Sequence, residues 1–151
     1  MSDAIELEVS EVLAAVPMRP GVESGLVVLT EVPLPHRSLS IYIGQHEARA
    51  VQAGQRPGVP DRPSTWDLYL VSLNALGAEL VGATIDRVEE SRHFFATLEI
   101  TCEGRTHRLS CRPSDAVALV VRQLGAGLFA LEEVLAEAGR YPAGYGYPGP
   151  E

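Results

Sequence analysis

The sequence predicts an α+β domain, because segments with the period of a strand are interleaved with segments that begin and continue like helices. Ile5, Leu7 and Val9 alternate with polar residues, as on a strand with one solvent-facing side. The stretches 62–68 and 111–119 both contain Arg-Pro-Ser, then an acid and an apolar run. Proline suits the first turn of a helix, so both stretches indicate helix starts.

Length and composition indicate one domain. The 151 residues, of which 46% are hydrophobic, suffice for one core. No apolar run reaches the roughly eighteen residues of a membrane span. The acidic N-terminus lacks the pattern of a secretory signal, so we expect a cytoplasmic protein without membrane attachment. Cys102 and Cys111 are too few for a disulfide framework and lack the spacing of a zinc site, so inert thiols are expected.

The charge balance excludes one class of protein. A net charge of −8 argues against a protein that coats nucleic acid through electrostatics alone. It does not exclude a nuclease, because a local arginine patch or bound metal ions can offset the global repulsion. Residues 105–112 form the only locally basic stretch, with Arg105, His107, Arg108 and Arg112. A solvated sheet edge explains this stretch about as well as a phosphate-binding surface does.

The expected strands follow from alternating or short apolar runs bounded by turn residues. They cover residues 5–9, 25–31, 38–43, 80–88, 94–100, 105–111 and 128–131. A turn is expected at 18–24, and Glu103-Gly104 predicts a hairpin between two of these strands.

Four helices are expected, over residues 45–53, 64–76, 114–124 and 132–138. Ser64 and Asp67 have the spacing of a capping box, and Ser114 is predicted to cap the helix that carries Asp115 in its first turn. That helix is apolar nearly all round, which is typical of a central, covered helix.

Two segments lie outside this pattern. Residues 54–63 predict a loop of the kind that often borders a site. The folded domain is expected to span residues 1–138, and the Pro-, Gly- and Tyr-rich tail 139–151 to be disordered or draped over the surface.

Four segments in a fixed order carry a resemblance to a known family. They are Ile43-Gly-Gln-His-Glu-Ala-Arg-Ala-Val51, Arg62-Pro-Ser-Thr-Trp-Asp-Leu68, Leu76-Gly77 and Arg112-Pro-Ser-Asp-Ala-Val-Ala-Leu119. Together they resemble the bifunctional nuclease family of bacteria and plants, over roughly residues 5–138. The resemblance implies an α+β fold with a mixed, mostly antiparallel sheet and three to four packed helices. It also implies self-association into homo-oligomers and cleavage of both DNA and RNA.

One position departs from the family's pattern. The second motif usually reads Arg-Pro-x-Thr-His-Asp-Leu, and here Trp66 takes the place of the histidine. An indole can only donate a hydrogen bond, so it cannot replace a general base or a metal ligand. Either that histidine is not required for the chemistry, or this chain has kept the fold and lost the chemistry.

A metal-assisted phosphodiesterase is the first functional hypothesis. Carboxylate-bound Mg²⁺ or Mn²⁺ can make hydroxide at neutral pH and stabilise the charge of the phosphorane. The candidate catalytic and metal-binding residues are Glu47, Asp67 and Asp115, and the candidate substrate-binding residues are Arg62, Arg112 and Ser114. We expect their carboxylates and guanidinium groups to converge on one cleft. His36, His46, His93 and His107 show no ligand spacing with one another, and His46, beside Glu47, is the first to test.

Two alternatives remain open. In the first, the arginines pair with Asp67 and Asp115 inside the core, and the protein is a non-catalytic homo-oligomeric or regulatory module. In the second, the helix starts at Ser64 and Ser114 bind a small phosphorylated ligand, since helix N-termini are anion sites.

Overall fold

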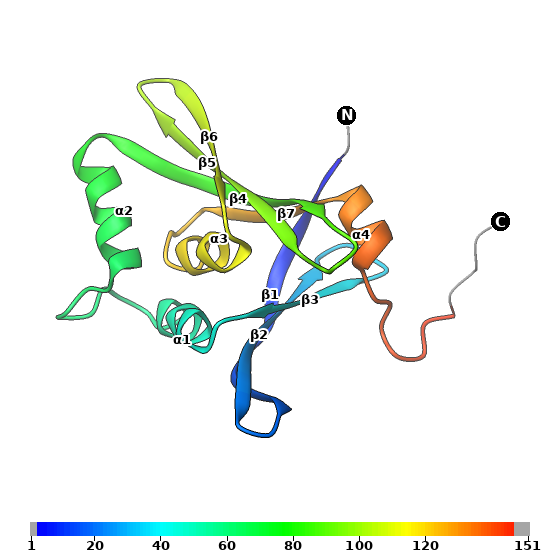
Figure 1. Cartoon of the computed structure of the whole chain (residues 1–151). Coiled ribbons are helices and arrows are strands. Elements are labelled where there is room, and N and C mark those ends of the chain that lie inside the picture. Colours follow the sequence, from blue (N-terminus) through cyan, green and yellow to red (C-terminus); the bar gives the residue numbers. More distant parts are fainter. Residues whose placement is uncertain (1–2, 147–151) are drawn as a thin grey trace.

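A computed structural model describes residues 3–146 of the chain. Within this range a seven-stranded sheet with the order β3-β2-β1-β7-β4-β5-β6 is combined with four helices (Figure 1). In chain order the elements are β1 (Ala4–Arg19), β2 (Val22–Glu31), β3 (Ser38–Ile43), α1 (Gln45–Gly54), α2 (Thr65–Ala75), β4 (Ala78–Val88), β5 (Phe94–Cys102), β6 (Arg105–Cys111), α3 (Pro113–Val120), β7 (Gly127–Leu131) and α4 (Glu132–Ala138). The predicted α+β class and mixed, mostly antiparallel sheet are confirmed.

The strand β1 joins the two halves of the sheet. It pairs with β2 from Leu7 to Arg19 but with β7 only over residues 4–6. Among the described strands, β4 and β7 form the one parallel pair. The expected turn at 18–24 is shorter than predicted, because Pro20 and Gly21 alone separate β1 from β2. A two-stranded ribbon therefore projects from the body of the molecule (Figure 1).

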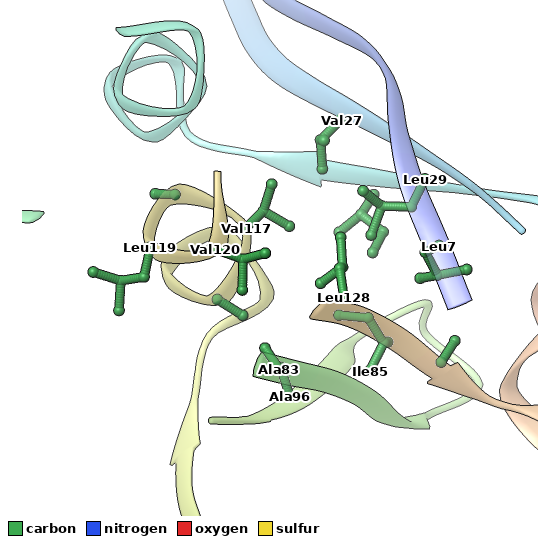
Figure 2. Close-up of a cluster of buried hydrophobic side chains, with 14 of the residues drawn as sticks. Leu7, Val27, Leu29, Ala83, Ile85, Ala96, Val117, Leu119, Val120 and Leu128 are labelled. Atoms are coloured by element: carbon green, nitrogen blue, oxygen red, sulfur yellow. The ribbon is translucent and has the colours of Figure 1, made fainter. Parts of the chain in front are cut away.

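The helix α3 lies at the centre of the core, as its all-round apolar sequence predicts. Six of its eight residues are buried. Figure 2 shows Val117 and Val120 among the side chains of β2 and β4, including Leu29 and Ile85. Full burial of such a side chain contributes about 1.5–3 kcal/mol. This packing fixes the position of Arg112 and Asp115 at the start of α3.

The two predicted helix caps have different outcomes. Ser64 forms the predicted capping box with Asp67 at the start of α2. The prediction that Ser114 caps α3 is wrong: Arg112 is the N-cap residue, and Ser114 lies buried in the first turn without a capping hydrogen bond. In α3 Pro113 occupies the first helical position, which proline favours, whereas in α2 the equivalent Pro63 lies before the cap, so the shared Arg-Pro-Ser sequence does not decide which residue caps the helix. The helix also ends at Val120 and not near residue 124.

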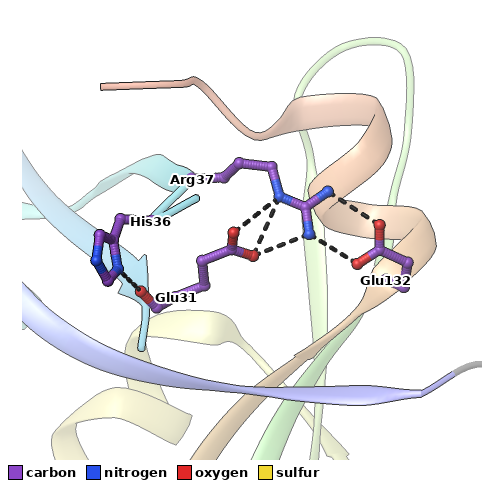
Figure 3. Close-up of polar contacts among 4 residues, drawn as sticks. All are labelled: Glu31, His36, Arg37 and Glu132. Carbon is purple, nitrogen blue, oxygen red and sulfur yellow. Dashed lines mark hydrogen bonds and ion pairs between the residues drawn. The ribbon is translucent and has the colours of Figure 1, made fainter. Parts of the chain in front are cut away.

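The helix α4 is attached to the β2–β3 connection by an ion cluster (Figure 3). Arg37 Nη2 lies 2.9 Å from Glu31 Oε2 and 2.7 Å from Glu132 Oε2, so one guanidinium bridges two carboxylates. The Glu31 side chain is only 1% exposed. Hydrogen bonds from Arg37 lower the pKa of Glu132 and outweigh the effect of its burial. The cluster therefore favours the ionised form of Glu132.

The segment after α4 begins along the sheet. Ser38 and Arg140 exchange two backbone hydrogen bonds of 2.9 Å each, and the rings of Tyr141 and Tyr145 stack 5.0 Å apart. The start of the predicted tail is therefore draped against β3, while residues 147–151 lie outside the described part. None of the helices between residues 3 and 146 is long and apolar enough to cross a membrane.

Candidate functional site

Three helices surround a cavity of about 470 Å³, which we call the helix cleft. Its walls come from α1, α2, β5, β6 and α3. The lining residues are His46, Thr65, Trp66, Tyr69, Leu98, Leu109, Ser110, Cys111, Arg112, Asp115 and Leu119. The volume falls in the range of roughly 300–1,000 Å³ that is usual for small-molecule sites.

Arg112 lies at the mouth of the helix cleft and binds two carboxylates. Its Nε donates to Asp115 Oδ2 at 2.8 Å and its Nη2 to Oδ1 at 2.9 Å, a bidentate pair. Its Nη1 lies 3.5 Å from Glu47 Oε1. The hydrogen bonds to Asp115 raise the pKa of Arg112. The Arg112 side chain remains 60% exposed, so its other N–H groups are open to a ligand.

Asp67 lies in a different environment. Its Oδ2 accepts hydrogen bonds from the backbone N–H of Ser64 (2.8 Å) and the Ser64 hydroxyl (2.7 Å), and its Oδ1 accepts one from Arg122 Nε (2.9 Å). The Asp67 and Arg122 side chains are only 11% and 6% exposed. Asp67 lines a second cavity of about 650 Å³, formed with the end of α1, the loop that follows it (residues 53–59 together) and residues 121–125. The carboxylate of Asp67 therefore caps the start of α2 and joins this helix to Arg122, just after the end of α3.

The predicted convergence of acids and arginines is met in part. The structure brings together Glu47, Arg112 and Asp115, whereas Asp67 pairs with Arg122, and Arg62 is exposed without an ion pair in the described part of the chain. Among residues 3–146, no three His, Cys, Asp or Glu side chains form a group that could hold a metal ion. The predicted three-carboxylate arrangement is therefore not formed, because Arg122, 55 residues from Asp67, occupies that carboxylate.

Aromatic rings also line the helix cleft. The ring centroids of His46 and Trp66 lie 5.8 Å apart with the planes tilted by 51°. The Arg122 guanidinium lies 5.9 Å from the Trp66 ring and supports it from the other cavity. Burial, and to a lesser degree the neighbouring Cys111, raise the pKa of Tyr69. Burial also raises the pKa of the Cys111 thiol to about 11, so this thiol is neutral at physiological pH and serves as an apolar wall.

Sequence reasoning did not identify Trp66 and Tyr69 as cleft residues. The available signal was their i, i+3 spacing, which places both side chains on one face of α2. Arg122 carried no local signal, because its carboxylate partner comes from another helix.

Replacing Asp67 with Asn should lower the free energy of unfolding by about 3–5 kcal/mol at neutral pH, because the substitution breaks a buried ion pair and leaves Arg122 uncompensated. Burial raises the pKa of Asp67, but the hydrogen bonds from Ser64 and Arg122 outweigh it, so the pKa lies below its ordinary value of 3.8. A lowered pKa in the folded state stabilises the protein above the ordinary value, and this contribution is lost as the pH falls through the folded pKa. In urea unfolding, the difference in free energy of unfolding between wild type and Asp67→Asn should therefore be largest at neutral pH and should shrink below about pH 4.

Asp61→Asn is the matched control for that experiment, because Asp61 is exposed and has no ion pair in the described part of the chain. It should change stability by less than about 0.5 kcal/mol. A difference between wild type and Asp67→Asn that stays constant down to about pH 2 would contradict the predicted linkage.

Comparison with known proteins identifies the family to which this chain belongs. The family described as "Bifunctional nuclease domain" matches residues 27–142. The chain belongs to this family. The matched segment contains every residue of the helix cleft and most of the sheet, whereas β1 lies before it. The bifunctional nuclease domain of this protein thus coincides with the elements that build the cleft.

Two relatives come from Mycobacterium tuberculosis. They are the uncharacterized protein MT1877 of strain CDC 1551 / Oshkosh and the uncharacterized protein Rv1829 of strain ATCC 25618 / H37Rv. Each is 40% identical to this chain over 103 residues, which is 68% of this chain and 60% of the relative. The match thus spans about three fifths of the length of these relatives.

Proposed function

We propose that this protein is a nuclease and that the helix cleft is where it binds one nucleotide and cleaves the adjoining phosphodiester bond. The observation that carries the proposal is Arg112, a mostly exposed guanidinium fixed by Asp115 and Glu47 beside a cavity with aromatic walls. Family membership supports the same reaction class. The acidic surface of the chain as a whole does not oppose it, because the phosphate contact is local.

The side chains of the helix cleft have separate roles in this proposal. Trp66 and Tyr69 hold a base by stacking, which every base permits because every base has a π-face. Arg112 donates to the phosphate oxygens and stabilises the charge that develops on the phosphorane. The oxygen of a water attacks phosphorus while His46 accepts the proton of that water. The bond between phosphorus and the leaving oxygen breaks, and the leaving oxygen takes up a proton from solvent. Asp115 and Glu47 position Arg112.

A resident divalent ion fits this donor set poorly. Asp115 is hydrogen-bonded to Arg112 through both oxygens, Glu47 contacts the same guanidinium, and Asp67 lies in the other cavity. An ion would have to displace Arg112 to gain two carboxylates. The proposed mechanism therefore includes no step that depends on a metal.

Arg112→Gln tests the proposal. Hydrogen bonds to charged groups contribute about 1.5–3 kcal/mol, so kcat/KM on short DNA and RNA strands should fall roughly 10- to 100-fold. The matched control is Arg108→Gln, since Arg108 is exposed like Arg112 but lies on β6 and pairs with Glu99. The proposal is wrong if both variants cleave at the wild-type rate, because the cleavage would then come from a contaminating enzyme. Cleavage in EDTA should persist.

A non-catalytic homo-oligomeric module is the second candidate, and apolar surface favours it. Five large hydrophobic side chains are at least half exposed along α2 and around the second cavity: Val59, Leu68, Val71, Leu76 and Leu124. Contiguous exposed apolar surface is typical of interaction sites. Purified protein that sediments as an oligomer and cleaves neither DNA nor RNA would support this candidate over the nuclease.

A further inference from the structure

We propose that one face of β6 is a track that guides single-stranded nucleic acid into the helix cleft, with Arg105 and His107 as its phosphate contacts. The inference rests on the proposed nuclease function and names the form of its substrate. It assigns a role to the basic stretch 105–112, of which the cleft itself uses only the end.

The register of β5 and β6 places these side chains on the same side as the cleft. Leu109 pairs with Leu98, and both line the helix cleft. His107 pairs with Ile100, which is buried on the same face as Leu98, and Arg105 follows two residues further along β6. Directly opposed residues of antiparallel strands point to the same side of a sheet, and successive residues alternate. Arg105, His107 and Leu109 therefore form one row that ends in the cleft.

The charge of β6 differs between its two faces. Arg108 points to the opposite side, where its Nη2 lies 3.1 Å from Glu99 Oε1, so its charge is balanced. Arg105 and His107 have no ion pair or hydrogen-bonded side-chain partner within the described residues, and both are exposed. No acidic residue occurs between Arg105 and Arg112. In a chain of charge −8, the row beside the cleft is thus an unbalanced basic surface.

The track is open and of suitable length. The strand β6 is the last in the sheet order, so no described strand covers its outer edge. Leu109 lies four residue steps along β6 from Arg105, which corresponds to about 14 Å at a rise of ~3.4 Å per residue. That length matches roughly four stacked nucleotides at ~3.4 Å each. A basic groove that ends at stacking aromatic rings is the arrangement by which proteins bind single strands, whereas a duplex would keep its bases away from Trp66 and Tyr69.

A simpler explanation is that charged residues on an edge strand only prevent sheet-to-sheet aggregation. Under that explanation, replacing Arg105 or Arg108 should affect nucleic-acid binding equally, because both lie on the edge strand and both are exposed. The track gives importance to Arg105 and His107 alone. The two explanations therefore differ in a measurable way.

The test is fluorescence anisotropy with labelled oligonucleotides, whose linkages are phosphorothioates to slow cleavage. The ligands are a dinucleotide, which fits the cleft alone, a single strand of about eight nucleotides, in DNA and RNA forms, and a duplex of the same length. Wild-type protein should bind the longer single strand about tenfold more tightly than the dinucleotide at low salt. Arg105→Gln/His107→Ala should lose most of this length advantage, and its salt dependence should fall by about 0.7 per lost phosphate contact. Arg108→Gln should keep the advantage.

The track would be overturned by a length advantage that survives in Arg105→Gln/His107→Ala, by an equal loss in Arg108→Gln, or by duplex bound as tightly as the single strand. Equal effects for DNA and RNA would place recognition on the shared phosphates, as proposed, whereas an effect confined to one of them would contradict it. Cleavage of a second dinucleotide, with an ordinary phosphodiester linkage, separates the two proposals. If the dinucleotide is cleaved but the tighter binding of the longer strand does not depend on Arg105 and His107, the track is wrong and the proposed nuclease function is retained. If that cleavage is absent while length-dependent binding persists, the nuclease is wrong.

Discussion

Arg37→Ala should lower the free energy of unfolding by about 3–5 kcal/mol, because it removes the single cation between two carboxylates. The guanidinium donates to Glu31 through Nε and Nη2 and to Glu132 through Nη1 and Nη2. Without it, Glu31 is left as a carboxylate with 1% of its side chain exposed. Since domains of this size are stable by only about 5–15 kcal/mol, the loss is a large share of the total. Urea unfolding followed by circular dichroism measures it.

Two further variants decide whether the cost comes from the orphaned carboxylate. Arg49→Ala removes an exposed arginine of α1 that has no ion pair in the described part, so it should cost less than about 0.5 kcal/mol. Arg37→Met combined with Glu31→Met should be more stable than Arg37→Ala alone, because replacing both partners removes the uncompensated charge. If the double variant instead loses as much stability as Arg37→Met and Glu31→Met lose separately, added together, the cost does not come from the carboxylate of Glu31 being left without a cation.

Local patterns in the sequence were sufficient to predict most of the secondary structure. The helix α4 was predicted with its observed bounds, and the hairpin at Glu103-Gly104 forms with both residues at positive φ (51° and 75°). These features depend on neighbouring residues, whose chemistry is visible in a single sequence. The length of β1 was underestimated because its second half lies on the projecting ribbon, where apolar and polar residues no longer alternate strictly.

Pairings between distant segments were not predictable in the same way. The sequence predicted that Asp67 and Asp115 would meet in one cleft with Arg62 and Arg112. Instead Asp67 pairs with Arg122, and the Arg37 cluster joins residues 95 positions apart. An arginine side chain can reach several carboxylates, and only the packing of α2 against α3 decides which one. Arg112 and Asp115 were predictable as neighbours because they are three residues apart at a helix start.

The same reasoning explains the partial success at the candidate site. Glu47 and Asp115 were identified from their positions in first helical turns, and they do meet at Arg112. The cavity beside them depends on the orientation of α2, which no motif encodes. Thus the charged half of the helix cleft was predicted, and its aromatic half required the structure.

His46→Ala should lower kcat for cleavage of short single strands by about 10²- to 10⁴-fold and leave KM nearly unchanged, if His46 transfers the proton as proposed. It is the histidine among the residues that line the helix cleft, and its ring faces Trp66 at 5.8 Å. Trp66 itself cannot act as a base, because the indole N–H only donates. Because His46 is exposed, the substitution should leave the melting temperature unchanged, which separates a catalytic effect from a structural one.

The matched control is His93→Ala, since His93 is also exposed but lies at the turn before β5 and bonds to Ser91. It should cleave at the wild-type rate. An equal loss in both variants would indicate a general effect on the protein, and no loss in His46→Ala would remove the proposed base. Arg112→Gln distinguishes the two roles, because loss of a phosphate contact also weakens binding of the ground state and so raises KM. From the geometry of the helix cleft we therefore expect His46→Ala to change kcat alone. We expect Arg112→Gln to change both kcat and KM.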